Sequence, residues 1–334
     1  MSSLSAPAMA MLVGMNFSFL DPQMHGADAC AKDPSINFRG AMFLPKYSDP
    51  LIRERVKDEL GQLRQSGFSS IRTLVAFADR PSRFSDWFDS GLSTQDAPRL
   101  VAEYVSDVTA AGFNHLELAF SSQAGANPAC RKERWGDCFN NATIAQNIAF
   151  VTAVRRGLAP PPGIELRFDL ANEACIVPEM ARPLAENYQS YIRPLVAEYR
   201  HQFPRDNVTV SCSIGRLAEA RPRLDETFAA AGSGPSFYEI HAYENSTIDI
   251  NAIALNLKHA LGNSSAPLVI GETNFGLPSY TNRLLSALEA VDVRVESILF
   301  WPLKNSANDC GVDVPPPYTR SGALGSTPIP QTKE

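Results

Sequence analysis

Three features that would assign the chain to a membrane or to nucleic acid are missing from its sequence. No apolar run reaches the roughly 18 residues that a bilayer-spanning helix needs. No long block of Lys and Arg occurs, and the net charge is −6, so an anionic partner would meet little clustered positive charge. We therefore expect no membrane and no nucleic-acid partner, and we expect a neutral or cationic substrate.

The start of the chain lacks the pattern of a signal peptide. Met1 to Ala10 is small and polar and has neither a charged segment nor an apolar one. Two locations stay open: a secreted or periplasmic protein if a signal peptide has been removed, and a cytoplasmic protein if none existed. We expect a monomer.

The sequence also lacks the spacings that hold a metal ion. It has five scattered His and six Cys, and no Cys-x-x-Cys occurs. We therefore expect no metal and no cofactor. Cys130 and Cys138 flank a short polar stretch and could close a small disulfide loop. For the other cysteines, a buried thiol and a disulfide remain equally open.

A Gly-rich phosphate loop after the first apolar segment is missing as well, which argues against a dinucleotide-binding sheet. Short apolar segments instead alternate with helical patterns along the chain. Near-continuous apolar segments are typical of parallel strands buried on both faces. The expected strands are Met11–Phe19, Ser70–Phe77, His115–Phe120, Glu165–Leu170, Asn207–Ser213, Phe237–Tyr243, Pro267–Thr273 and Ser297–Pro302. Eight such units predict an α/β fold, a single (β/α)8 TIM barrel.

The helical patterns lie between these strands. The clear ones are Leu51–Gln65, Pro98–Ala111, Thr143–Arg155, Pro183–His201, Ile250–Leu261 and Tyr280–Val291, and Arg216–Ala231 is less regular. We expect a catalytic barrel over residues 11–320, with flexible tails at 1–10 and 321–334. The stretches after the first, second, third and eighth strands are long, and those on the opposite side are short. In such barrels the functional face is formed by the loops that follow the strands, which predicts the site there.

Two carboxylates fall where strands run out into these loops. The fourth strand leads into Asn172 and Glu173, and the seventh ends at Glu272. Strands four and seven lie nearly opposite each other in an eight-stranded barrel, so both side chains can reach one central cleft. Each Glu alone would more often be a surface residue. Two facing carboxyl groups, however, are what cleavage of a glycosidic bond needs.

Other polar and aromatic residues fall at comparable positions. His241 and Tyr243 alternate on one face of the sixth strand, Arg72 lies in the second, and Trp301 ends the eighth. Arg, Tyr and His could hold a carboxylate ionised and oriented, and a Trp face suits the stacking of a sugar ring. Each residue has an ordinary structural alternative, such as an ion pair or core packing. Their ordered appearance along the chain favours a site.

This set of residues resembles the clan A glycoside hydrolases, the superfamily that includes the cellulase-like family five enzymes. The matching positions are Arg72, Asn172, Glu173, His241, Tyr243, Glu272 and Trp301. The resemblance implies a retaining mechanism with Glu173 as the general acid/base and Glu272 as the nucleophile. It further implies that Asn172 binds the sugar 2-hydroxyl, and that Arg72 and Tyr243 position Glu272.

The chain departs from family five at two positions. Ala174 stands where a Pro often follows the strand-four Glu, and the third strand ends without the usual His. A neighbouring or divergent family is therefore favoured. Candidate sugar-binding aromatics outside the motif are Trp87, Phe88, Trp135, Phe275 and Tyr280, of which Trp135 is included with the expected substrate-binding residues.

The function expected from these observations is a retaining glycosidase, endo-acting on a β-linked polysaccharide or oligosaccharide. A transglycosylase would use the same residues and remains open. A non-catalytic carbohydrate-binding barrel would typically have lost one carboxylate. A metal-dependent sugar isomerase would need three or four converging ligands. Only Glu173, His241 and Glu272 could serve as metal ligands here. Asp169 is expected to lie too deep in its strand.

Overall fold

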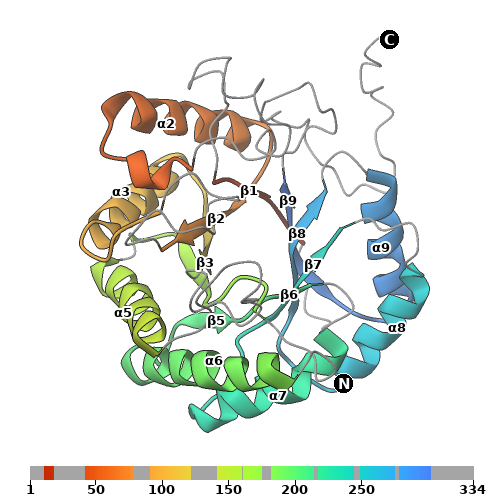
Figure 1. Cartoon of the computed structure of the whole chain (residues 1–334). Helices are drawn as coiled ribbons and strands as arrows, with labels where there is room; N and C mark the ends of the chain where they lie inside the picture. The colour runs from red at the N-terminus through yellow and green to blue at the C-terminus, as the bar shows by residue number, and fades with distance from the viewer. Residues whose placement is uncertain are drawn as a thin grey trace, which may run out of the picture.

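The structure of the chain is a computed structural model that describes residues 11–18, 42–77, 91–121, 141–159, 161–174, 182–213, 217–243, 249–274 and 278–301. These residues form a ring of strands with helices around its outside (Figure 1). The strands are β1 (Leu12–Asn16), β2 (Ser70–Ala76), β3 (His115–Ser121), β4 (Glu165–Asp169), β5 (Asn207–Thr209), β6 (Cys212–Ser213), β7 (Tyr238–Ala242), β8 (Leu268–Asn274) and β9 (Val295–Trp301). The helices are η2 (Leu44–Lys46), α2 (Pro50–Gln65), α3 (Ala97–Ala110), α5 (Asn141–Gly157), α6 (Arg182–Gln202), α7 (Leu217–Ala230), α8 (Ile250–Leu261) and α9 (Pro278–Ala290).

The strands pair in parallel around the ring in the order β5-β4-β3-β2-β1-β9-β8-β7-β6. The two end strands of this sheet, β5 and β6, are separated in the chain only by Val210 and Ser211. They are therefore two halves of one interrupted strand, and the chain itself joins the ends of the sheet. The fold is a nearly closed, single (β/α)8 TIM barrel, which confirms the predicted fold class.

The predicted elements are found with small changes at their ends. The expected strand Asn207–Ser213 is broken in two, and the last strand begins at Val295 rather than at Ser297. The irregular pattern over 216–231 corresponds to a helix, α7, which contains Pro222 near its start. Both predicted tails, and most of the long segments after the strands, lie outside the described residues. Within the described part of the chain, no helix is both long and apolar enough to cross a bilayer.

Apolar packing lies mainly between the strands and the surrounding helices. In α2, for example, Ile52, Val56, Leu60 and Leu63 recur at helical spacing and are buried against the barrel. Every residue of β2 is buried, because helices cover its outer face and the barrel interior covers its inner face. This two-sided burial explains why the strands have near-continuous apolar sequences.

The interior of the barrel holds both apolar clusters and buried charged side chains. Near the amino ends of the strands, a small cluster of Phe237, Val269 and Leu299 fills the space. Further along the strands, charged side chains enter the interior, and Arg72 is the largest of the fully buried side chains. Buried charges need partners. This buried charged group therefore indicates where a functional site has been built.

Candidate active site

Glu173 and Glu272 lie at the same end of the barrel, as predicted. Glu173 follows the end of β4, and Glu272 lies within β8. A carboxylate oxygen of each residue and a ring nitrogen of His241 all lie within 4.8 Å of one another. His241 bridges the two carboxylates, because its Nδ1 lies 3.0 Å from Glu173 Oε1 and 3.5 Å from Glu272 Oε1. The two candidate catalytic groups thus share one small polar space.

The Glu272 carboxylate is buried and held by two donors. Its side chain is 8% exposed, and Arg72 Nη1 donates to Oε1 over 2.7 Å. The Tyr243 hydroxyl donates to Oε2. Burial, followed by the negative charge of Glu272, raises the pKa of Tyr243 well above its usual value, so the phenol keeps its proton. A carboxylate that is paired and oriented in this way is suited to attack an electrophile.

Glu173 has a different environment. Its side chain is 42% exposed, and its backbone has a φ of 53°, in the left-handed region that residues other than Gly rarely adopt. The backbone N–H donates to Ser211 Oγ over 2.8 Å, and Ser211 Oγ in turn donates to Asp169 Oδ2 over 2.7 Å. Asp169 Oδ1 also accepts the Ser211 N–H over 3.0 Å. These bonds fix the turn that carries Glu173.

The same contacts explain the interruption between β5 and β6. Ser211 lies at the break, and its N–H bonds to the Asp169 side chain rather than to a neighbouring strand. Asp169 is fully buried at the end of β4, as expected from the sequence. Burial raises its pKa, while the Arg72 charge opposes that shift. The strand break therefore couples the core of the barrel to the position of Glu173.

Arg72 is the centre of the buried polar network. It is fully buried, and its guanidinium lies within 2.6 to 3.1 Å of four carboxylates, those of Glu117, Asp169, Glu239 and Glu272. Asn16 Oδ1 and Asn172 Oδ1 also accept hydrogen bonds from it, at 3.1 and 2.7 Å. Although burial alone would lower the Arg72 pKa, the surrounding carboxylates raise it well above its usual value. The guanidinium therefore stays charged.

The histidine of the site is charged as well. Burial alone would lower the His241 pKa, but the Glu272 charge and hydrogen bonds to Glu173 and Glu239 outweigh it and raise the pKa to about 10. At neutral pH the ring is therefore an imidazolium. Beneath it, burial and the charge of Glu239 raise the pKa of Glu117 to about 8, against the opposing effect of Arg72. The buried network therefore retains protons that separate side chains in water would have lost.

Gly271 makes room for this network. A Cβ atom at position 271 would lie 1.8 Å from Glu239 Oε1, so no larger residue fits beside that carboxylate. The pairing of β7 with β8 also shifts register between Ile240 and His241. Such irregularities re-aim side chains next to functional sites. Here His241 pairs in register with Glu272.

The structure thus brings six of the predicted site residues together: Arg72, Asn172, Glu173, His241, Tyr243 and Glu272. Trp301 ends β9, which runs beside β8, but its side chain lies outside the described set. Trp135 lies outside the described residues, as do the other loop aromatics Trp87, Phe88 and Phe275. The expectation that Tyr280 binds sugar is wrong. Tyr280 is 1% exposed and packs in the main core, so it cannot contact a sugar.

Sequence reasoning missed several members of the network. Asn16, Glu117, Ser211 and Glu239 all contact Arg72, Asp169 or His241. One signal was present: Glu239 precedes His241 by two positions, as His241 precedes Tyr243, so all three share one strand face. A charged residue within an otherwise apolar strand is a second signal, and it applies to Glu117.

Two groups of acidic and histidine side chains come close enough to suggest a metal ion. One is Asp169, Glu239 and His241, and the other is Glu173, His241 and Glu272. In the first group the Arg72 guanidinium already contacts all three side chains, at 3.1 to 3.3 Å. A cation of the protein thus lies where the metal would be. In the second group, Arg72 likewise pairs with Glu272.

Two further observations concern the rest of the chain. Cys212, the one cysteine among the described residues, is disulfide-bonded, whereas Cys130 and Cys138 lie outside them.

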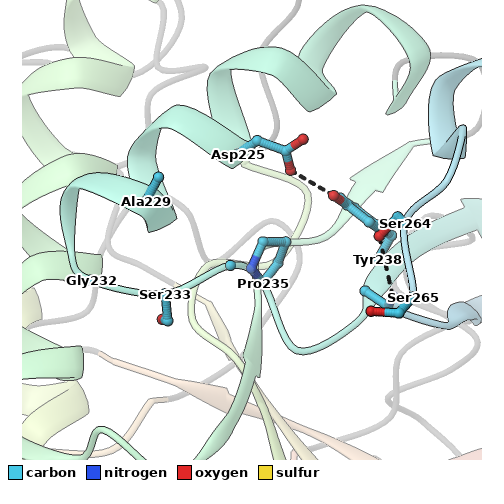
Figure 2. A pocket seen from close by; sticks show the side chains of 10 residues that line it. Asp225, Ala229, Gly232, Ser233, Pro235, Tyr238, Ser264 and Ser265 are labelled. Carbon is cyan, nitrogen blue, oxygen red and sulfur yellow. Dashed lines mark hydrogen bonds between the residues drawn. The ribbon is translucent and has the colours of Figure 1, made fainter.

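A surface pocket lined by small residues lies at the other end of the barrel, between the end of α7 and the segments before β7 and β8 (Figure 2). Among its lining residues, the Tyr238 hydroxyl donates to Asp225 over 2.6 Å. It is remote from Glu173 and Glu272.

Comparisons with known proteins identify the fold. No family model and no curated protein matches the sequence. Among solved structures, the chain is similar to an exo-β-1,4-mannosidase from Opitutaceae bacterium strain TAV5, with 14% identity and a TM-score of 0.53 over 87% of this chain and 52% of that one. It is similar to a β-mannanase from Streptomyces thermolilacinus, with 13% identity and a TM-score of 0.54 over 93% and 86% of the two chains.

A third similar structure is a broad-specificity endoglucanase from Clostridium longisporum, with 12% identity and a TM-score of 0.54 over 90% of this chain and 89% of that one. The chain spans about half the length of the mannosidase and most of the length of the other two. These three structures are described as a mannosidase, a mannanase and an endoglucanase. At such low identity the likeness establishes the shared barrel fold.

Proposed function

We propose that this chain is a retaining glycoside hydrolase that cleaves a β-linked polysaccharide or oligosaccharide through a covalent glycosyl-enzyme. Glu272 is the nucleophile and Glu173 is the general acid/base. The single observation that carries the proposal is the spacing of these two carboxylates, whose nearest oxygens lie within 4.8 Å. Carboxyl groups about 5–5.5 Å apart are typical of retaining enzymes, whereas inverting enzymes need about 6.5–9.5 Å to admit a water molecule.

The different surroundings of the two carboxylates support their different roles. Glu272 is buried and receives hydrogen bonds from Arg72 and Tyr243, which fix its orientation. Glu173 is more exposed, so it can reach the oxygen atoms of a leaving group and of an incoming water. A nucleophile needs a fixed charge, whereas an acid/base group needs access to both oxygens.

The first half of the reaction breaks the glycosidic bond. A Glu272 oxygen forms a bond to the anomeric carbon while the bond from that carbon to the leaving oxygen breaks. Protonated Glu173 transfers its proton to that oxygen, and the leaving alcohol departs. Arg72 and Tyr243 hold the attacking carboxylate in line with the anomeric carbon. Asn172, whose Oδ1 accepts from Arg72 at 2.7 Å, is held so that its amide nitrogen can bind the sugar 2-hydroxyl.

The second half of the reaction releases the sugar. The Glu173 carboxylate removes a proton from water, and the resulting oxygen attacks the anomeric carbon as the ester bond to Glu272 breaks. Two inversions leave the anomeric configuration unchanged. His241 Nδ1 lies 3.0 Å from Glu173 Oε1, so the ring is placed to orient this carboxylate towards the water.

The names of similar structures support the substrate class. They include enzymes described as acting on β-1,4-linked mannosides and on glucans, one of them with bound mannohexaose. Long segments follow strands β1, β2, β3 and β9, and loops at this end of a barrel form the substrate cleft. The long loops favour an endo-acting enzyme on a polymer, and mannan, glucan, galactan and bacterial exopolysaccharides are the substrates to test.

Azide rescue is the test of the assigned roles. In Glu272→Ala, cleavage of an activated aryl β-glycoside should fall by several orders of magnitude, and azide should restore it by attacking from the vacated side. The product should be the α-glycosyl azide. In Glu173→Gln, poor leaving groups should be affected far more than activated ones. Near-native turnover in Glu272→Ala, or a β-azide from it, would refute the assignment.

A further inference from the structure

Two buried carboxyl groups meet beneath the candidate active site. Glu117 on β3 is 3% exposed and Glu239 on β7 is fully buried. Both approach the same donor, Arg72 Nε, with their Oε1 atoms at 2.6 and 3.1 Å. Because both contact the same nitrogen, the two carboxyl groups lie close to each other. Neither side chain reaches substrate, so the pair has a role other than direct catalysis.

Two carboxylates held this close together repel each other unless one of them binds a proton. Two carboxylates in contact within a water-excluded interior cannot both ionise, so one of them stays protonated near neutral pH. Burial and the Glu239 charge raise the pKa of Glu117 to about 8, which makes Glu117 the member that holds the proton. Glu239 Oε1 contacts two basic groups, Arg72 Nε at 3.1 Å and His241 Nε2 at 3.2 Å, so the negative charge of the pair is assigned to Glu239.

The Glu239 carboxylate lies next to the ring of His241. His241 Nε2 lies 3.2 Å from Glu239 Oε1, and Nδ1 lies 3.0 Å from Glu173 Oε1. A chain of contacts therefore runs from Glu117 through Glu239 and His241 to Glu173. It connects the interior of the barrel with the candidate acid/base.

His241 Nε2 has a second neighbour that favours the opposite ring state. Arg72 Nη2 lies 3.3 Å from Nε2 and could donate to it only if Nε2 carried no proton. The charge of Glu239 therefore decides between two states of the ring. With Glu239 ionised, Nε2–H donates to it and the ring is an imidazolium. Without that charge, the ring accepts from Arg72 and is neutral.

We propose that Glu239 is a positioning residue that holds His241 as a doubly protonated ring aimed at Glu173, and that Glu117 supports it by holding the shared proton. The charged groups facing this pair come from every adjacent strand: Arg72 on β2, Asp169 on β4, and His241 and Glu272 on β7 and β8. Glu173 and Glu272 approach Nδ1 of His241, whereas Glu239 is the carboxylate hydrogen-bonded to Nε2.

The consequence for catalysis rests on the proposed function. When Glu272 becomes an ester it loses its charge, and with it one of the interactions that keep His241 protonated. Glu239 still carries its charge at that stage. It therefore preserves the imidazolium next to Glu173 during the half-reaction in which Glu173 acts as a base.

The state of the ring can be observed without substrate. The chain has five His, so ¹⁵N NMR of the imidazole nitrogens can follow each ring over pH, with the His241 signals assigned from their loss in His241→Asn. The full chain should show His241 doubly protonated at pH 8. In Glu239→Gln the midpoint of the His241 titration should fall by at least about 1 unit, because an isosteric neutral amide replaces the charge. An unchanged titration in Glu239→Gln would overturn the proposal.

Three variants sharpen this test. Glu239→Asp keeps the charge and should retain most of the wild-type behaviour. Glu117→Gln keeps a donor to Glu239 and should leave His241 doubly protonated at pH 8. Glu165→Gln removes a carboxylate 3.3 Å from another histidine, His115, at the far end of the barrel, and should leave the His241 signals unchanged. A fall in the His241 midpoint in Glu165→Gln equal to that in Glu239→Gln would also refute the proposal.

Kinetics separate this proposal from the proposed function. With activated aryl glycosides, for which release of the sugar limits the rate, Glu239→Gln should move the acid limb of kcat to higher pH, and Glu239→Asp should move it back. If the NMR titrations agree with the expectation but no glycan is cleaved, the proposed glycosidase function is refuted and the assignment of the His241 ring stands. Cleavage with a pH profile unaffected by Glu239→Gln would refute the positioning role alone.

Discussion

The Arg72 guanidinium donates to the Glu272 carboxylate across the barrel, with 2.7 Å between Nη1 and Oε1 and 200 positions of sequence between the two residues. This contact places a positive charge beside the Glu272 carboxylate and fixes its orientation. It also ties the candidate nucleophile to three further buried carboxylates that share the same cation. The stability of the barrel and the chemistry of the site therefore depend on one side chain.

Arg72→Met should destabilise the protein strongly, because it leaves four carboxylates buried without their cation. Removing one partner of a buried ion pair costs about 3–5 kcal/mol of unfolding free energy. Denaturant unfolding measures this loss. Arg53→Ala is the matched control, since Arg53 pairs with Glu103 and Asp107 at the partly exposed surface and should cost about 1 kcal/mol or less. Equal losses in the two variants would contradict the account.

Tyr243→Phe should leave the fold intact and lower kcat. It removes the hydroxyl that donates to Glu272 Oε2. Hydrogen bonds to charged groups are worth about 1.5–3 kcal/mol, which corresponds to a loss of about ten- to hundredfold. Tyr104→Phe removes a buried hydroxyl that contacts Thr73 outside the site, at 2.8 Å, and should affect stability but not kcat. A Tyr243→Phe enzyme with wild-type kcat would show that this contact does not position the nucleophile.

Ser211→Ala should disturb Glu173 without touching its carboxylate. The substitution removes both the acceptor for the Glu173 N–H and the donor to Asp169. We expect a loss of about 1–3 kcal/mol in unfolding free energy, and a rate loss greater for poor leaving groups than for activated ones. Ser236→Ala removes a comparable acceptor for the Val208 N–H, at 3.0 Å. It should reduce stability only, and a leaving-group effect there would argue against the assigned role of Ser211.

The buried network predicts that stability falls as pH rises. Glu117 has a pKa of 4.5 when unperturbed and about 8 in the fold, so between these values the folded state binds more protons than the unfolded state. The pKa of His241 is likewise raised, from 6.5 to about 10, so between these pH values the folded state again binds more protons than the unfolded state. Each group contributes stability that is complete below its unfolded pKa and is lost as pH rises through its folded pKa.

Unfolding experiments over pH can isolate the Glu117 contribution. Each extra proton bound by the folded state changes the unfolding free energy by about 1.4 kcal/mol per pH unit. In Glu117→Gln the titrating group is absent, so the slope between pH 4.5 and about 8 should become less negative by up to one proton. An identical slope in the two proteins would show that Glu117 releases its proton as freely in the fold as in the unfolded chain.

The fold and the central residues of the site could be predicted from the sequence because their signals are local. Apolar segments and helical patterns gave the order of strands and helices, and Glu173 and Glu272 stand where strands end. Parallel strands in a barrel bring their carboxyl ends together, so the meeting of these residues followed from topology alone.

The supporting network could not be predicted, because it depends on contacts between distant strands. Glu117 and Glu239 meet through the closure of the barrel and through the space beside Gly271, neither of which has a local signal. The break between β5 and β6 results from the side chain of Asp169, 42 positions before Ser211. Tyr280 was misassigned because helix periodicity shows which residues lie on one face, but not which face is buried.

The central claim is double displacement by Glu272, and the most direct measurement is ¹H NMR of the first product released from a panel of β-linked glycans. The panel should include mannans, glucans, galactans and bacterial exopolysaccharides, with Glu272→Gln measured in parallel. The account predicts that the β-anomer appears first, equilibrates later, and is absent with Glu272→Gln. Initial release of the α-anomer, or equal release by wild type and Glu272→Gln, would contradict it.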